Sequence, residues 1–197
     1  MAKRAGLIAG VCMWALAVVS AAAPDAEHDD VPRYNADGRL TFPSSYREWI
    51  FLSSGLGMSY SAEGAGAADP SFTNVFVSPS AYRSFQRTGT WPDKTMLVLE
   101  VRASRSRGSI NQGGHFQTDL NAVEVEVKDQ SRFAGKWAFF GFGDGTGPAK
   151  QIPTAASCYS CHAANGAVDN TFVQFYPTML AVAKTRGTIR PQNANER

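Results

Sequence analysis

Hydrophobic and polar residues alternate along the middle of the chain with the two-residue period of a β-strand. The strictest alternation is Val-Glu-Val-Glu-Val at 123–127, within a strand that we expect over 115–129. Its valines are expected to face the protein interior and its glutamates water. Aromatic and β-branched stretches predict further strands at 72–78, 95–104 and 137–143. Strands this close together along the chain predict a mainly antiparallel sheet.

Helix signals lie among and beside these strands. A short helix within 41–55 starts at a serine whose capping box is completed by Glu48. A second helix runs from Ser78, its N-cap, to Gly89, which closes it. A third lies within 168–187 and is either interrupted or opened at Pro177. The predicted fold class is therefore α+β, a mainly antiparallel β-sheet with flanking short helices.

The first 23 residues differ from the rest of the chain. Lys3 and Arg4 form a short positive region, an apolar run follows over 7–19, and small residues follow over 20–23. This is the arrangement of a secretory signal peptide, because the apolar run is shorter than the roughly 20 residues that span a membrane. We expect 1–23 to be removed on export to the periplasm; an uncleaved anchor is the alternative.

The remaining chain is long enough for one domain with a sizeable core. We expect a flexible lead-in over 24–38, a single domain over 39–190 and a flexible tail over 191–197. The chain has 19 basic and 17 acidic residues, and loss of Lys3 and Arg4 makes the two numbers equal. A near-neutral chain without a basic stripe predicts no binding of nucleic acid.

The spacing of the cysteines gives the strongest indication of chemistry. Cys12 leaves with the signal peptide, so Cys158 and Cys161 remain, in a Cys-Tyr-Ser-Cys-His sequence that ends at His162. This is the pattern of c-type haem attachment, in which two thiols bond the vinyl groups of the porphyrin and the adjacent imidazole binds the iron. We expect one covalent haem c near the C-terminus, with His162 as the iron ligand.

Three other kinds of site use the same cysteine spacing. A thioredoxin-like pair comes early, after a strand and at a helix N-terminus, whereas this pair comes late and follows a loop-like stretch. A structural zinc site needs four ligands, and His28 and His115 are the only further histidines. A disulfide across two residues would be strained and would close little chain. The cysteine number and the signal peptide favour haem.

The second axial position of the iron separates electron carriers from ligand-binding haem proteins. His115, Met58, Met96 and Met179 are the candidates for a sixth ligand. Packing or surface exposure also explains each of them. Small electron-transfer cytochromes c are mostly helical and place the haem motif early, whereas strand-rich sequence precedes the motif in this chain.

Four stretches resemble the cytochrome P-460 family, which includes the cytochromes c′-beta. They are LTFPSSYREWIF at 40–51, FTNVFVSPSAYRSFQRTGTWPDKT at 72–95, VEVKDQSRFAGKWAFFGF at 125–142 and PTAASCYSCHAANGAVDNTFVQFYP at 153–177. The resemblance extends over nearly all of 40–190. It implies a mainly antiparallel sheet with flanking helices, a homodimer, and a five-coordinate haem that is held by the motif histidine and open on its distal face.

Two activities occur in that family. Members with a lysine cross-linked to the haem oxidise hydroxylamine, and members without it bind nitric oxide, with weak peroxidase activity as an alternative. The aligned position of this lysine is Leu99. Lys94 lies five residues earlier, an odd offset that points to the other face of a strand, and we expect it to be a solvated turn residue. The resemblance therefore implies the cytochrome c′-beta type.

The resemblance also implies candidates for the distal face of the haem. Phe51 and Phe76 lie in segments that resemble the family's distal wall and are the best candidates for an apolar lid, with an ordinary place in the core as the alternative for each. Arg47, His115 and Glu124 are candidates for polar or catalytic roles there. Strand alternation turns Glu124 to water; if it faces the iron instead, it can relay protons.

Three functions remain open from the sequence. The favoured one is an exported mono-haem cytochrome with an open site for a small gas such as nitric oxide. The second is a haem enzyme, a hydroxylamine oxidase or a peroxidase, which would need a distal acid–base group. The third is an electron carrier with a sixth ligand and a periplasmic redox partner.

Overall fold

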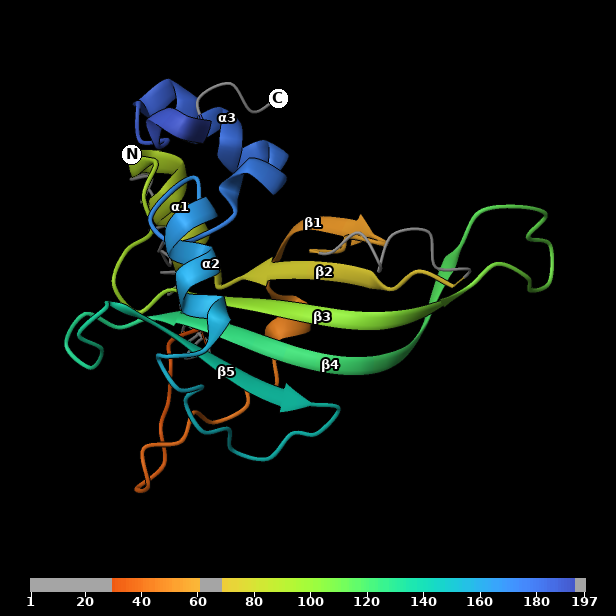
Figure 1. Ribbon diagram of the computed structural model, residues 1–197, viewed down its shortest axis with the longest axis horizontal. Helices are drawn as coiled ribbons and strands as arrows, with labels where there is room; N and C mark the ends of the chain where they lie inside the picture. The colour runs from red at the N-terminus through yellow and green to blue at the C-terminus, as the bar shows by residue number, and fades with distance from the viewer. Residues whose placement is uncertain (1–29, 61–68, 194–197) are drawn as a thin grey trace, which may run out of the picture.

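The computed structural model describes residues 30–60 and 69–193, and its centre is a five-stranded antiparallel sheet (Figure 1). The strands lie in sequence order, so each one pairs with its neighbours along the chain. They are β1 (Ile50–Leu56), β2 (Phe72–Val77), β3 (Met96–Arg105), β4 (Phe116–Lys128) and β5 (Trp137–Gly143). The predicted α+β class with a mainly antiparallel sheet is confirmed.

Four of the strands, β2 to β5, lie where the alternation and the β-branched stretches predicted them. The first strand lies within 41–55, where a helix was predicted, so that prediction is wrong. That stretch holds only one 3₁₀ turn, η1 (Tyr46–Glu48), which lacks a side-chain cap bond, and then continues as β1. Pairing of β1 with β2 supplies backbone hydrogen bonds that outweigh the local helix signal.

The helices gather at one end of the sheet, and the β3–β4 hairpin extends away at the other end (Figure 1). They are α1 (Pro79–Thr88), α2 (Ser157–Asn165) and α3 (Pro177–Arg186), with 3₁₀ turns η3 (Val173–Phe175) and η4 (Pro191–Asn193). The predicted helix starts at Ser78 and Pro177 and the end at Gly89 are confirmed. Within the described part of the chain, none of the helices is long and apolar enough to cross a bilayer.

Two residues of the predicted flexible lead-in, Asp30 and Tyr34, contact the domain. Asp30 is 6% exposed, and its Oδ2 accepts a hydrogen bond of 2.9 Å from the Ser80 amide in the first turn of α1. This carboxylate caps α1 in place of the predicted Ser78 side chain, which makes no cap bond. The ring of Tyr34 packs edge-on against Phe133.

At the other end of the chain, η4 was predicted to lie in a flexible tail, yet Asn193 is buried. The predicted signal peptide, 1–23, lies outside the described residues.

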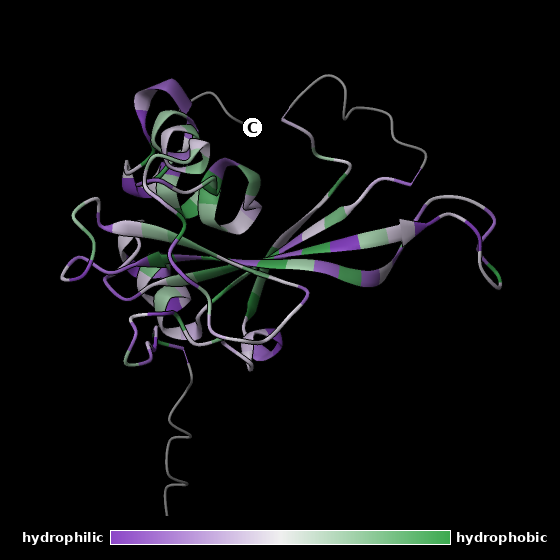
Figure 2. Cartoon of the chain, turned by 60° about the horizontal axis from the view of Figure 1, so that its bottom comes forward, coloured by the Kyte–Doolittle hydropathy of each residue, from purple (hydrophilic) through white to green (hydrophobic). Residues whose placement is uncertain are grey.

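The sheet separates two hydrophobic cores. On one face, Val123, Val125 and Val127 of β4 pack with Leu40 and Trp49 from the segment before β1. On the other face, α1 and α3 pack against the sheet. Hydrophobic residues gather where the helices meet the sheet, whereas the strands alternate in hydropathy towards the β3–β4 hairpin (Figure 2). Near the helices, therefore, both faces of the sheet are covered.

Candidate functional site

Helix α2 carries the two cysteines and the histidine of the motif. Cys158, Cys161 and His162 occupy positions i, i+3 and i+4, which project to the same side of a helix. All three line one cavity, and both cysteines are free, half-buried thiols. The structure therefore brings together the three residues that the sequence predicted to hold a haem.

The position of α2 is fixed by contacts rather than by burial, since none of its residues is buried. The Tyr159 ring packs perpendicular to Phe139 of β5, with centroids 4.8 Å apart. The Tyr159 hydroxyl donates a hydrogen bond of 3.0 Å to the Ile152 carbonyl. These contacts hold the helix against the edge of the sheet that β5 forms.

The cavity lies on the helix-covered face of the sheet and has a volume of about 580 Å³. Sites for small molecules and cofactors range over roughly 300–1,000 Å³. Most of its lining is apolar, and β2, β3 and β5 contribute Val75, Leu97, Leu99, Val101 and Phe139. Two carboxylates, Glu124 and Glu126 of β4, line it as well.

The imidazole of His162 is held by two aromatic rings and by a hydrogen bond at one nitrogen. The rings of Phe139 and Phe172 lie 4.5 and 4.3 Å from it, centroid to centroid. Nδ1 is 2.7 Å from the carbonyl oxygen of Asn170. A carbonyl can only accept, so Nδ1 carries the proton and Nε2 keeps the lone pair that a metal needs.

Glu126 is the second polar neighbour of His162. Its Oε1 lies 3.4 Å from His162 Nδ1, its side chain is only 10% exposed, and this oxygen has no hydrogen-bond partner. Burial raises the pKa of the Glu126 carboxyl above its ordinary value. For His162, burial alone lowers the pKa, but Glu126 and the Asn170 carbonyl reverse this, so the net shift is upward.

The prediction that both glutamates of β4 face water is wrong for Glu126, and Glu124 borders the cavity despite its exposure. The valines of β4 do face a core, as predicted, but the opposite face is covered by α2 and the segments that follow it. Strand alternation identifies the two faces of a strand; it does not reveal that the second face borders a cofactor-sized cavity.

Leu99 lies on the cavity wall, directly opposite Glu124 on the neighbouring strand. Lys94 lies away from the cavity, in a turn with a positive φ of 63°. It is 40% exposed, forms an ion pair with Asp129, and donates a hydrogen bond of 3.1 Å to Ser131. Among the described residues, no lysine lines the cavity.

The two candidates for an apolar lid, Phe51 and Phe76, do not line the cavity. Their rings contact each other, with centroids 5.8 Å apart, and Phe76 packs against Tyr46 in the core on the opposite face of the sheet. On β2, Thr73 and Val75 face the cavity, so Phe76, one residue further along, points away from it.

Two of the three polar candidates for the distal face also lie elsewhere. Arg47 forms an ion pair of 2.5 Å with the buried Glu100, on the face opposite the cavity. His115 immediately precedes β4, at the hairpin end of the sheet, and does not line the cavity. Glu124 is the remaining candidate, and it does line the cavity.

Among the candidates for a sixth ligand, Met58 lines the cavity and is 46% exposed. Met96 and Met179 are fully buried in the two cores, as their apolar surroundings in the sequence suggested. Sequence reasoning missed Asn170 and Phe172. Asn170 acts through its backbone carbonyl, so its side-chain type carries no signal of the role.

The donor set suits a haem: two thiols and an oriented imidazole lie along one wall of a largely apolar cavity of cofactor size. Over the described residues, His, Cys, Asp and Glu form no cluster of three or more that could hold a metal ion by themselves. That part of the chain therefore offers no set of four ligands for the zinc site that the sequence left as an alternative.

The comparison with known families agrees with this site. The family model described as Cytochrome P460 matches residues 43–173, which include all five strands, α2 and the Cys-Tyr-Ser-Cys-His motif. No curated protein matches the chain. Since the family match covers well over half of the sequence, the chain belongs to the cytochrome P460 family and is a haem-binding cytochrome of the c type.

Proposed function

We propose that this chain is an exported mono-haem cytochrome that binds a small neutral gas such as nitric oxide. Cys158 and Cys161 would hold the haem through two thioethers, and His162 Nε2 would bind its iron. The observation that carries the proposal is the apolar cavity wall at Leu99, where the hydroxylamine-oxidising members of the family have a cross-linking lysine. A leucine side chain cannot form that bond.

The chain's own residues prepare the site before a gas arrives. The Asn170 carbonyl holds the proton on Nδ1 of His162, and Phe139 and Phe172 fix the plane of the ring. When bound, the haem supplies an iron with a vacant coordination position. Apolar side chains such as Leu99 and Val101 favour small uncharged ligands over water and anions, because they offer neither hydrogen bonds nor charge.

A peroxidase-type enzyme is the second candidate, and Glu124 is the observation that favours it. Its carboxylate lines the same cavity and is exposed enough to exchange protons with solvent. General acid–base catalysis by one positioned group contributes about 10²–10⁴-fold to a rate. An electron carrier would require Met58, the methionine at the cavity, to bind the iron.

We further propose that the chain is exported to the periplasm, loses residues 1–23 and forms a homodimer. The signal-like first 23 residues support export, because thioethers to haem form outside the cytoplasm. The dimer follows from the family resemblance. A periplasmic electron-transfer partner would be needed to reset the oxidation state of the iron after each reaction with a redox-active ligand.

The decisive test is the absorption spectrum of the reduced protein before and after nitric oxide, combined with the intact mass under denaturing conditions. We expect a high-spin five-coordinate spectrum that changes with nitric oxide, and the mass of the chain plus one haem. Met58→Leu is the matched control and should leave the spectrum unchanged. A low-spin wild type that becomes high-spin in Met58→Leu would instead identify an electron carrier.

A further inference from the structure

The turn that follows α2, from Val168 to Thr171, supplies a backbone acceptor for His162, the Asn170 carbonyl at 2.7 Å. A second acceptor, Glu126 Oε1, lies 3.4 Å from the same nitrogen. A single proton on Nδ1 can be donated well to one of them. The position of this turn therefore decides whether a neutral carbonyl or a carboxylate receives the proton of the iron ligand.

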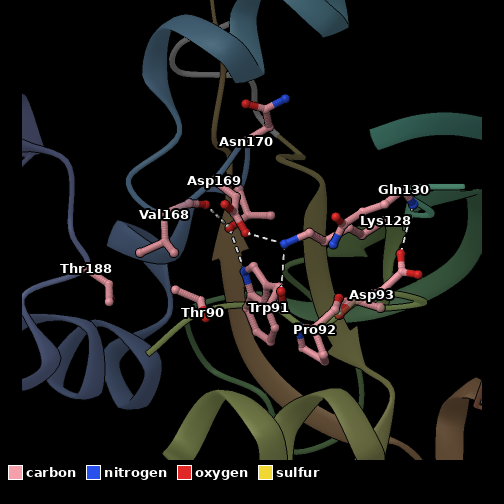
Figure 3. Close-up of polar contacts among 12 residues, drawn as sticks. Thr90, Trp91, Pro92, Asp93, Lys128, Gln130, Val168, Asp169, Asn170 and Thr188 are labelled. Atoms are coloured by element: carbon pink, nitrogen blue, oxygen red, sulfur yellow. Dashed lines mark hydrogen bonds and ion pairs between the residues drawn. The ribbon is translucent and has the colours of Figure 1, made fainter. Parts of the chain in front are cut away.

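A buried lysine holds one side of this turn. Lys128, at the end of β4, is 7% exposed, and its Nζ donates to Asp169 Oδ2 at 2.9 Å and to the Trp91 carbonyl at 2.6 Å (Figure 3). Asp169 has a positive φ of 52°, a backbone conformation that few residues other than glycine adopt. The ion pair thus fixes the turn at its conformationally most demanding residue.

Two further side chains, Trp91 and Arg190, hold the turn from other directions. The Trp91 indole donates a hydrogen bond of 2.8 Å to the hydroxyl of Thr171, which is completely buried. Arg190 donates to the Asp169 carbonyl and to Asn170 Oδ1, and also to the Ala163 carbonyl of α2 at 2.5 Å. Arg190 therefore ties the turn to the helix that carries His162.

We infer that Lys128 is a positioning residue: through Asp169 it holds the Asn170 carbonyl as the hydrogen-bond acceptor of His162 and keeps this proton away from Glu126. The inference rests on the proposed ligation of the haem iron by His162. A carboxylate acceptor makes an imidazole a stronger electron donor than a carbonyl acceptor does. The clamp thereby keeps the iron less electron-rich and its reduction potential higher.

The test compares wild type and Lys128→Met as holo-proteins at a fixed pH above neutrality. The measurements are the iron–histidine stretching band of the ferrous haem, by resonance Raman spectroscopy, and the reduction potential. In Lys128→Met we expect the band to move to higher frequency and the potential to become more negative. Lys94→Met is the matched control: it also removes an ion-paired lysine, but one that binds Asp129 instead of this turn, and neither quantity should change.

The double variant Lys128→Met/Glu126→Gln separates the proposed mechanism from general loosening. Its band should lose the upward shift, because no carboxylate remains to accept the proton. A shift that persists without Glu126, or a Lys128→Met protein identical to wild type, overturns the inference. If Lys128→Met does not fold, Asp169→Asn removes the same ion pair with a residue that tolerates positive φ, and the same shifts are expected.

The outcomes also distinguish the inference from the proposed function beneath it. A wild-type protein without an iron–histidine band overturns the ligation by His162, and the role of Lys128 with it. A normal wild-type band that Lys128→Met leaves unmoved overturns the role of Lys128 alone.

Discussion

At the scale of single residues, the cavity wall pairs an inert side chain with a reactive one. Leu99 and Glu124 lie opposite each other on β3 and β4, and both line the cavity. Leu99 is the observation behind the proposed gas binding, whereas Glu124 is the group that a peroxidase would use. The two functions therefore depend on different residues and can be separated by substitution.

Glu124→Gln should leave the affinity for nitric oxide unchanged within about threefold, because a neutral diatomic ligand gains little from a carboxylate. Any peroxidase turnover of the wild type should fall by about 10²–10⁴-fold, since the amide cannot transfer protons. Ligand titration and steady-state assays with hydrogen peroxide check both. Asp119→Asn, an exposed substitution on the same strand outside the cavity lining, is the control. Equal turnover in all three proteins would exclude Glu124 as an acid–base group.

At the scale of elements, the end of α2 packs tightly against the turn that follows it. A Cβ on Gly166 would lie 2.8 Å from the Asn170 carbonyl carbon, 2.8 Å from the His162 oxygen and 2.9 Å from the Thr171 nitrogen. All three atoms belong to the backbone, so no side chain can move aside. Position 166 requires glycine because the neighbouring backbone leaves no room for a Cβ, and not because of its φ.

Gly166→Ala should therefore lower the free energy of unfolding by about 1–3 kcal/mol, as forced overpacking does. Gly135→Ala is the matched control, because nothing lies within 4 Å of its Cβ position and its φ is not positive. That change should stay within about 0.5 kcal/mol of wild type. Urea unfolding measures both. Equal stability of the two variants would mean that the turn moves freely away from α2.

A second element, the turn between β4 and β5, makes the stability depend on pH. Burial alone would raise the pKa of the Asp129 carboxyl, but hydrogen bonds from Lys94 and Ser131 outweigh it, so the net pKa is lowered. A lowered pKa in the folded state stabilises the protein above the unfolded value of about 3.9. This stabilisation is lost as the pH falls through the folded pKa.

We therefore expect the free energy of unfolding to fall between about pH 5 and pH 2, and Asp129→Asn to remove part of that dependence. At pH 7 the variant should be less stable by about 1–3 kcal/mol, since it loses charge-assisted hydrogen bonds in a buried position. Urea titrations at a series of pH values measure both effects. An unchanged acid slope in Asp129→Asn would place the dependence on other carboxylates.

Much of the element pattern was predictable because period-two alternation directly reports a half-buried strand, as in β4. Helix α2 was not predicted, since none of its residues is buried and it therefore shows no apolar stripe. The motif residues followed from spacing alone. The role of Glu126 could not be predicted in this way, because it depends on the register of β4. The role of the Asn170 carbonyl could not be predicted either, because the turn that carries it is held by residues distant in sequence, Lys128 and Arg190.

At the scale of the whole molecule, the two cores have different relations to the cofactor. The core on the far face of the sheet lies mostly away from the cavity: Val123 and Val127 are completely buried there and do not line the cavity, although Val98, Val125 and Phe140 border it. The core under the helices borders the cavity, and Leu97 and Tyr176 belong to both. A haem in the cavity would complete the second core and leave most of the first unchanged.

The last prediction follows from this asymmetry. A haem-free variant, Cys158→Ala/Cys161→Ala/His162→Ala, should keep the amides of β3 to β5 protected, because most of the far core packs away from the cavity. Amides of α2 and α3 should lose protection by about tenfold or more, since an empty apolar cavity destabilises its lining. Hydrogen exchange followed by mass spectrometry measures this by segment, with the holo wild type as control. Equal loss across both cores would mean that the sheet itself folds only around the haem.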